Sequence, residues 1–366
     1  TSRNYFWTGK SWDTQGNRPC VRNSEVTYNR EASWKTFPER LEENGISWKV
    51  YQNEISLPTG VDDASLLANF TDNNLEWFSQ FNVRYSSGFQ KYIKGLQQSL
   101  PKDIADLERE LSQLSEDKKP EYQKKLQKKK QQLNQVNDVL KNWNYENFEK
   151  LSEFDKNLHN KAFTTNIGDP HYHKTESLTY DDHGNHRTLK VPKGDILHQF
   201  RKDVDQGNLP TVSWLAAPQK FSDHPSAPWY GAWYVSEVLD ILTKNPEVWK
   251  KTIFVLTYDE NDGYYDHIPP FVAPNPKHTK NLSPGLNTAE EYASLKQEMA
   301  KKDMDPKDAR ESPIGLGYRV PMVVASPWSK GGWVNSEVCD ITSTLMFLED
   351  LIKKRTGKSV EETNIS

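Results

Sequence analysis

Two adjacent carboxylates, Asp259 and Glu260, stand directly after a short apolar run at residues 253–256. The run is β-branched and bounded by polar residues, which is typical of a buried strand. In an open α/β sheet, ligands bind beyond the carboxyl ends of the strands, so chemistry is expected here. Neighbouring carboxylates repel each other, and a divalent cation with oxygen ligands removes that repulsion. The pattern predicts a metal site, with a solvated acidic loop as the alternative.

The same arrangement recurs earlier in the chain. Residues 209–217 are also typical of a buried strand, and they lead into Asp223 and His224. Parallel placement of the two strands would bring both polar clusters to one edge of a sheet. We therefore expect Asp259, Glu260 and His224 to lie close together at that edge.

A third apolar stretch, residues 319–325, predicts another buried strand. It leads towards Gly331 and Gly332, which permit either a close approach of the backbone to a ligand or a sharp turn. Both interpretations stay open at this point.

A loop-like stretch at residues 163–195 carries two histidines one residue apart, His171 and His173. In an extended chain both rings would lie on one face, a common arrangement for binding metal or phosphate. The alternative is a polar surface loop. No cysteine or third histidine stands at a zinc-finger spacing, which argues against a structural zinc site.

Composition sets limits on the class of protein. The chain has 366 residues, 12 of them Trp, and a formal net charge of −4, so it can bury a large core and has no overall attraction to nucleic acid. No apolar run is long enough to cross a bilayer. Cys20 and Cys339 allow one disulfide, but buried free thiols are favoured.

Residues 102–143 are rich in Lys, Glu, Gln and Leu, and their apolar residues step by three and four. The pattern breaks at residues 116–120, which predicts an antiparallel helical hairpin. Its basic run is read as a solvated helix face, and the hairpin as an insertion that carries no chemistry. Helices are also predicted at residues 34–45, 146–158, 196–204, 234–242, 289–302 and 340–352, and strands at 46–51 and 249–259.

Several long motifs resemble one known family. They are GDPHYH, LPTVSWLAAP, FSDHPSAPWYGAWYVSEVLDIL, TYDENDGYYDHIPPF and GLGYRVPMVVASPWSKGGWVNSEVCD. These are similar to the bacterial phospholipase C and acid phosphatase family, part of the alkaline-phosphatase-like superfamily, from WTG at residue 7 to FLE at 347–349. The resemblance implies an α/β fold, a three-layer sandwich around a mostly parallel sheet, with the helical hairpin inserted in a phosphoesterase domain covering residues 1–366.

The resemblance implies hydrolysis of phosphoesters by metal-assisted, two-step phosphoryl transfer. Charge on the phosphoryl oxygens must be neutralised and the leaving oxygen stabilised. By motif, Asp259 and Glu260 match the metal-binding carboxylates, and the metal is Ca, Mg, Mn or Zn. The expected catalytic histidines are His224, His267 and His173, the first and last near phosphate and leaving group. The expected substrate-binding residues are Asp223, Asp266, His171, Gly331 and Gly332, with Asp266 either orienting His267 or supporting the fold.

The chain departs from the family pattern at both ends. The family's opening strand ends in Glu-Asn, which is not found here, and the nucleophilic Thr or Ser would fall about two positions before Thr1. We therefore expect a domain that is partial at both ends, completed by an N-terminal portion of the same enzyme. The isolated chain is expected to have little activity.

Among activities, a phospholipase C acting on phosphatidylcholine-type lipids is favoured. Trp229, Tyr230, Trp233, Tyr264 and Tyr265 are available to surround a choline cation. An acid phosphatase on the same site is the chemical alternative, and a non-catalytic metal-binding module is the alternative of another class. The resemblance implies secretion or a periplasmic location, at most peripheral contact with a membrane, and no nucleic-acid partner.

Overall fold

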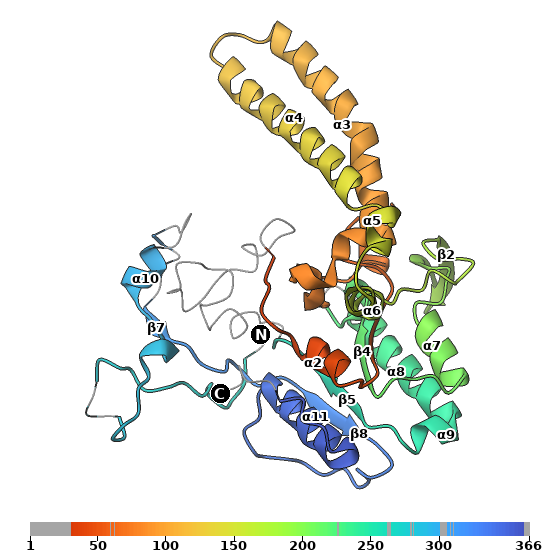
Figure 1. Ribbon diagram of the computed structural model, residues 1–366, viewed down its shortest axis with the longest axis vertical. Helices are drawn as coiled ribbons and strands as arrows, with labels where there is room; N and C mark the ends of the chain where they lie inside the picture. The colour runs from red at the N-terminus through yellow and green to blue at the C-terminus, as the bar shows by residue number, and fades with distance from the viewer. Residues whose placement is uncertain are drawn as a thin grey trace. The chain divides into compact units, whose positions relative to one another are not determined.

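The computed structural model describes residues 31–361, except 59, 62, 225–226, 262–264, 279, 281, 301–305, 308 and 310 (Figure 1). The chain divides into two compact units. The first unit comprises residues 45–242, and the second unit comprises residues 1–44 with 243–366. The WTG motif, Thr1, Cys20 and Tyr264 lie outside the described residues.

A parallel pair of strands forms the centre of the first unit. β1 (Trp48–Gln52) pairs with β4 (Val212–Ala216) in parallel, with Trp48 opposite Val212 and Gln52 opposite Ala216. Trp48 is buried and packs edge-to-face on Phe81 and Trp214. Both predicted strands of this unit are confirmed, and their carboxyl ends point to the same edge.

Helix α7 (His198–Asp205) is fastened to β1 by a buried carboxylate. Asp203 accepts hydrogen bonds from Lys49 Nζ at 2.5 Å and from Tyr51 OH at 2.6 Å. Burial, together with the Asp203 charge, raises the pKa of Tyr51, so the phenol remains a donor. These contacts hold β1 in place beneath the residues that follow it.

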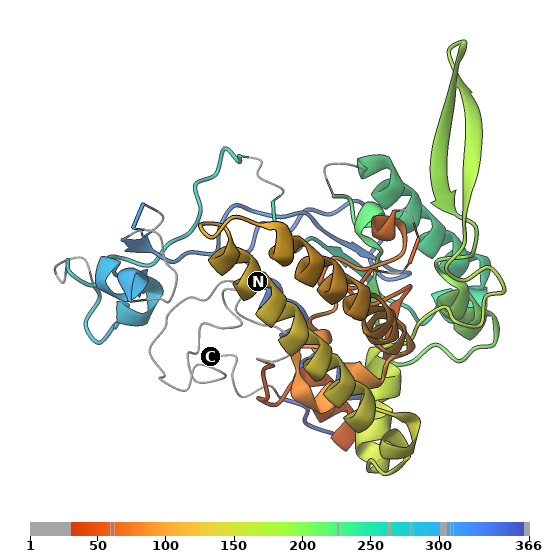
Figure 2. The same ribbon diagram turned by 90° about the horizontal axis from the view of Figure 1, so that it is seen from above.

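Two long helices run side by side in both views of the molecule (Figures 1 and 2). They are α3 (Ser87–Gln113) and α4 (Lys119–Asn142), which confirms that both arms of the predicted hairpin are helical. Part of the basic run ties the arms together, because Lys129 pairs with Asp103 at 2.8 Å and Lys130 with Glu108 at 2.6 Å. The other helical segments of this unit are η2 (Ala64–Leu66), η3 (Asn74–Trp77), η4 (Ser79–Phe81), η5 (Val83–Tyr85), α5 (Tyr145–Glu149), α6 (Glu153–Ala162), η6 (Gln219–Phe221) and α8 (Pro228–Lys244).

The stretch predicted to be a loop contains an antiparallel ribbon (Figure 2). β2 (Thr175–Asp182) pairs with β3 (Asn185–Pro192) through a two-residue turn at His183 and Gly184, with φ of 52° and 88°. Positive φ at both turn positions is the signature of a type I′ hairpin. The loop prediction was wrong here because most side chains of the ribbon are exposed, so no apolar alternation marks the strands.

In the second unit, β5 (Phe254–Thr257) and β8 (Met322–Ala325) are antiparallel, with Phe254 opposite Ala325. The prediction of a mostly parallel sheet is therefore wrong for the described residues, where β1–β4 is parallel and the other three strand pairs are antiparallel. The predicted strand at residues 319–325 is present as β8, but the expectation that it is buried is wrong, because Val323 is 52% exposed. The fold is mixed α/β, with its strands in small two-stranded sheets across the part described.

The rest of the second unit is mostly helical and irregular. Helix α2 (Phe37–Glu43) begins at a capping box formed by Thr36 and Glu39. Cys339 is an exposed thiol, contrary to the predicted burial. In the described portion of the chain, no helix has the length and apolar character to cross a membrane. The remaining elements are α9 (Pro246–Trp249), η8 (Ala289–Glu291), β6 (Tyr292–Ala293), α10 (Leu295–Met299), β7 (Ser312–Pro313) and α11 (Ile341–Thr356).

Candidate active site

The carboxyl ends of β1 and β4 are joined into one polar rim. Beyond β1, Glu54 forms a parallel bridge with Ala68, and Asn69 forms an antiparallel bridge with Pro218, which follows β4. The segment 68–70 therefore lies between the two strand ends. We call this edge, residues 52–56, 68–71 and 217–224, the β1–β4 rim. Ligands of α/β proteins commonly bind beyond the carboxyl ends of parallel strands such as these, so the rim is a candidate location for the site.

His224 lies on the rim and contacts the bridging segment. Its ring meets that of Phe70 edge-on, with centroids 5.8 Å apart. Asp223 has φ of 64°, a left-handed conformation that is uncommon outside glycine. A Cβ atom at Gly231 of α8 would stand 2.5 Å from the Asp223 backbone nitrogen. Only a glycine lets α8 approach this closely, and the approach fixes the backbone that carries His224.

Beneath the rim lies a buried network of amides and carboxylates. Glu76 is 0% exposed and accepts hydrogen bonds from Asn69 Nδ2 at 2.9 Å and Ser56 N at 3.1 Å. Asn73 Nδ2 donates to Gln52 Oε1 at 2.7 Å. Buried polar groups are tolerated only when they are hydrogen-bonded, so these contacts hold the rim in one arrangement.

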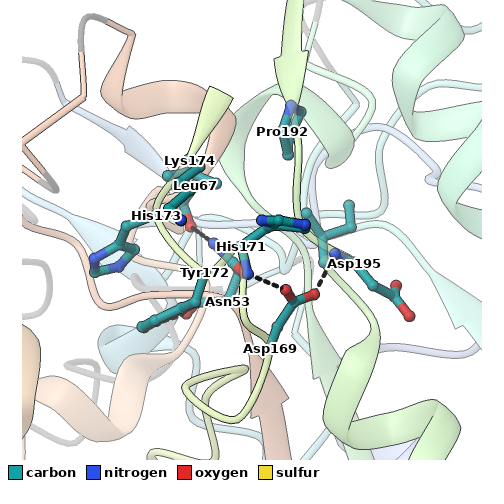
Figure 3. Close-up of a pocket in the computed structure, with 11 residues that line it drawn as sticks. Asn53, Leu67, Asp169, His171, Tyr172, His173, Lys174, Pro192 and Asp195 are labelled. Atoms are coloured by element: carbon teal, nitrogen blue, oxygen red, sulfur yellow. Dashed lines mark hydrogen bonds between the residues drawn. The ribbon is translucent and has the colours of Figure 1, made fainter. Parts of the chain in front are cut away.

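The histidines at 171 and 173 lie in a tight turn rather than in an extended segment. His173 has φ of 63°, and in Figure 3 the two rings point to opposite sides of the loop. The expectation that both rings share one face is therefore wrong. A left-handed residue reverses the direction of the chain at that point, which separates side chains that an extended segment would align.

Asp169 closes this turn. Its carboxylate accepts from His171 N and from Asp195 N, each at 2.6 Å (Figure 3). Burial alone would raise the pKa of Asp169, but the two backbone donors outweigh it and lower the pKa. Asn166 adds a second anchor by donating to Asn53 Oδ1 at 3.1 Å and to Ile196 O at 2.6 Å. The turn is thus attached to the end of β1 and to the approach to α7.

His173 faces a carboxylate of the rim. Its Nε2 lies 2.7 Å from Glu54 Oε2, and Glu54 is only 2% exposed. Tyr172 OH lies 2.9 Å from the same carboxylate oxygen, and the Tyr172 ring stacks on the His173 ring with centroids 3.9 Å apart. Through Glu54 and segment 68–70, His173 and His224 belong to one continuous rim.

The other predicted site residues lie in the second unit. Asp259 and Glu260 follow β5 directly and are exposed. Asp266 accepts two hydrogen bonds from Arg319, at 2.6 Å and 2.8 Å, and its Oδ1 lies 3.1 Å from His267 Nδ1. The Arg319 guanidinium lowers the pKa of Asp266. With its oxygens engaged in this way, Asp266 fits the role of orienting His267 better than direct contact with an anionic substrate.

A resident divalent metal fits the donor chemistry of Asp259 and Glu260, because paired carboxylates are the oxygen ligands that such ions prefer. Among the described residues, no three histidine, cysteine or acidic side chains gather into a metal-binding cluster. The two carboxylates therefore provide part of a ligand set, and the metal prediction stays a prediction.

Gly331 and Gly332 form a tight turn, with φ of 116° and 61°. Trp333 Nε1 donates to Lys330 O at 2.8 Å across this turn. Because β8 is antiparallel to β5, its carboxyl end lies at the opposite edge of that sheet from Asp259. The structure accounts for both glycines by the turn and does not place their strand end beside the acidic pair.

Comparison with known proteins decides the family. The model of the Phosphoesterase family matches residues 1–353. The chain belongs to this family. The non-hemolytic phospholipase C of Burkholderia pseudomallei is 32% identical over 375 residues, covering 100% of this chain and 38% of that protein. The non-hemolytic phospholipase C of Pseudomonas aeruginosa is 49% identical over 172 residues, or 46% of this chain and 23% of that protein.

Phospholipase C A of Mycobacterium tuberculosis is 38% identical over 162 residues, which cover 44% of this chain and 28% of that protein. The chain spans 38% of the length of the Burkholderia relative. The activity, substrates and partners of the whole protein are therefore matters for proposal.

Sequence reasoning missed two residues, Glu54 and Arg319, that contact predicted site residues. Glu54 stands next to Asn53 after a predicted strand, the same signal that singled out Asp259, but no histidine follows it in sequence. Arg319 was assigned only to the start of a strand. Arg319 stands just before one strand, and Asp266 stands in the acidic segment that follows the neighbouring strand. If two such strands are antiparallel, these positions lie at the same end of the sheet, so the pattern is a signal for an ion pair.

Proposed function

We propose that the protein hydrolyses phosphodiesters as a phospholipase C acting on phosphatidylcholine-type lipids. The observation that supports the proposal is the β1–β4 rim, where His224 contacts Phe70 and where Glu54 faces His173. Membership of the Phosphoesterase family and relatives named phospholipase C support the reaction class. We further propose that the complete domain forms the three-layer sandwich of the alkaline-phosphatase-like superfamily.

Each of the predicted residues has a distinct task in this reaction. A Thr or Ser hydroxyl, preceding Thr1, forms a bond to phosphorus and releases its proton to solvent. The bond from phosphorus to the glycerol oxygen breaks, and that oxygen takes a proton from His173. Water then attacks the phosphorus of the phosphorylated enzyme and gives one proton back to His173. The bond from phosphorus to the enzyme oxygen breaks, phosphocholine is released, and the enzyme oxygen takes a proton from solvent. General acid catalysis of this kind contributes roughly 10²- to 10⁴-fold.

His224 faces the phosphoryl group in this proposal, and His267, oriented by Asp266, assists it. Asp259 and Glu260 would hold the divalent metal, which when bound neutralises charge on the phosphoryl oxygens. His171, Asp223 and the glycine pair then line or support the substrate rather than carry protons.

The proposed choline headgroup is suggested by exposed aromatic side chains of α8. Trp229 is 84% exposed and Trp233 is 47% exposed, while Tyr230 stacks on Phe221. Aromatic faces attract quaternary ammonium groups such as choline. Secretion, or a periplasmic location, agrees with a substrate found in the membranes of other cells, and contact with the membrane would be peripheral.

The test compares two chromogenic substrates with the protein expressed from its native start. We expect p-nitrophenyl phosphorylcholine to be cleaved with a higher kcat/KM than p-nitrophenyl phosphate. The reverse preference would favour an acid phosphatase. Asp259→Asn should lower activity by roughly 100-fold or more, with little change in Tm, because it removes one charge of a metal ligand set. A module that binds metal only for structure would instead lose thermal stability while keeping its activity.

A further inference from the structure

We infer that Glu54 is the positioning residue of His173, and that the first turn of the helical hairpin holds Glu54 in place. The inference rests on the proposed function, since it assigns His173 the proton transfer to the leaving group. No motif pointed to Glu54, which stands 118 residues before Tyr172 in sequence and becomes its neighbour only in the fold.

Glu54 lies beside His173 and also contacts it through Tyr172. Glu54 Oε2 lies 2.7 Å from His173 Nε2 and accepts a hydrogen bond from Tyr172 OH at 2.9 Å. The Tyr172 ring in turn stacks on the His173 ring, with centroids 3.9 Å apart. A carboxylate that fixes the place of a histidine ring is a recurring device in proton transfer.

Glu54 is itself held from several sides. Its Oε1 accepts from Ile55 N at 2.9 Å, and Tyr172 OH lies 2.9 Å from Oε2. Burial and the Glu54 charge raise the pKa of Tyr172, so the phenol stays protonated and keeps its proton for hydrogen bonding. At 2% exposure, the Glu54 carboxylate has little solvent around it and few alternative positions.

Gly88, in the first turn of α3, closes over the carboxylate. A Cβ atom built at Gly88 would stand 2.2 Å from Glu54 Oε1 and 2.7 Å from Glu54 Cδ, so even alanine leaves no room for the present position. The amino end of a helix also favours a negative charge nearby. The base of the hairpin thus sets the position of the group that orients His173.

A leaving-group comparison in the native protein tests this inference. Dihexanoyl phosphatidylcholine releases an alkoxide that needs a proton, whereas p-nitrophenyl phosphorylcholine releases a phenolate that does not. For Glu54→Gln we expect kcat/KM, which reports the first phosphoryl transfer, to fall roughly 10- to 100-fold on the lipid but less than about 3-fold on the nitrophenyl ester. His173→Asn should show the same selectivity, and the double variant should lose no more than His173→Asn alone.

Two further variants separate positioning from structural damage. Glu76→Gln removes another buried carboxylate of the rim, one that binds Ser56 and Asn69, and should change both substrates equally. Gly88→Ala displaces the Glu54 carboxylate without removing it, and it should also lower activity on the lipid more than on the nitrophenyl ester. This variant tests the inference even if Glu54→Gln does not fold.

Equal losses on both esters in Glu54→Gln and Gly88→Ala, or additive losses in the double variant, would overturn the inference while leaving the hydrolase intact. If the unsubstituted protein cleaves neither ester, the proposed function fails and this inference with it.

Discussion

Replacement of Gly231 by alanine is expected to destabilise the protein, against the usual trend in helices. Gly231 lies inside α8, where alanine normally gains about 1 kcal/mol over glycine. Here the added Cβ would meet the Asp223 backbone, 2.5 Å from its nitrogen and 2.6 Å from its Cα. Backbone atoms cannot rotate away as the end of a flexible side chain would, so α8 or residue 223 must shift.

The magnitude follows from two opposing effects. Overpacking of this kind costs about 1–3 kcal/mol, and the helix propensity of alanine offsets about 1 kcal/mol of that. The difference is a net loss of up to about 2 kcal/mol in the free energy of unfolding. Gly95→Ala in α3 is the matched control, because a Cβ there meets nothing within 4 Å. That variant should gain about 0.5–1 kcal/mol.

Urea unfolding followed by tryptophan fluorescence gives both values, and thermal melts should move by roughly 2–4 °C per kcal/mol. Opposite signs for the two variants are the expected result. If Gly231→Ala stabilises the protein as Gly95→Ala does, α8 does not approach Asp223 as closely as described. The account of how the fold positions His224 would then be wrong.

Two further predictions concern the first unit. Asp203→Ala should lower the free energy of unfolding by roughly 3 kcal/mol, because it removes the carboxylate that accepts from Lys49 and from the buried Tyr51 hydroxyl. Urea unfolding measures this loss, and a value below about 1 kcal/mol would contradict the prediction. Burial lowers the pKa of His159, so its contribution to stability is complete above about pH 6.5 and is lost as pH falls towards the lower native pKa. His159→Gln should therefore flatten the decline in stability from pH 7 to pH 5, and unchanged slopes would refute the assignment.

Helices and strands with strong apolar periodicity could be predicted from the sequence. The hairpin arms, α7, α8 and α11 all have apolar residues at helical spacing, and all are present. The β2–β3 ribbon could not be found in this way, because it buries neither face and offers no alternating pattern. Its turn residues, His183 and Gly184, were the available signal.

Strand direction was beyond the reach of the pattern. The apolar runs at β5 and β8 indicate strands, but hydrophobicity is the same whether neighbours are parallel or antiparallel. The family resemblance favoured a parallel sheet, and the observed antiparallel pair moves Gly331 away from the end of β5. It also brings Arg319 to Asp266, a contact that no pattern within either segment foretells.

Candidate site residues divide in a similar way. Those in long motifs, such as His224 and His173, could be named from the sequence; His224 lies on the β1–β4 rim and His173 lies against Glu54 of that rim. The orientation of these two histidine side chains could not be predicted, because it depends on the left-handed backbone conformation of Asp223 and His173. Such conformations are held by surrounding contacts rather than by local preference. The partner of His173 was missed for the same reason, as Glu54 reaches it only through the fold.

Substitutions at the base of the helical hairpin are expected to affect activity more than substitutions at its tip. Lys129 and Lys130 pair with the facing arm, which stabilises the hairpin without touching the rim. The first turn of α3 differs, because Gly88 packs directly on the Glu54 carboxylate. The sequence alone suggested an insertion that carries no chemistry, and this holds only for the part remote from β1. Because the first turn and Glu54 occupy adjoining space, a change in how α3 begins must move the carboxylate that faces His173.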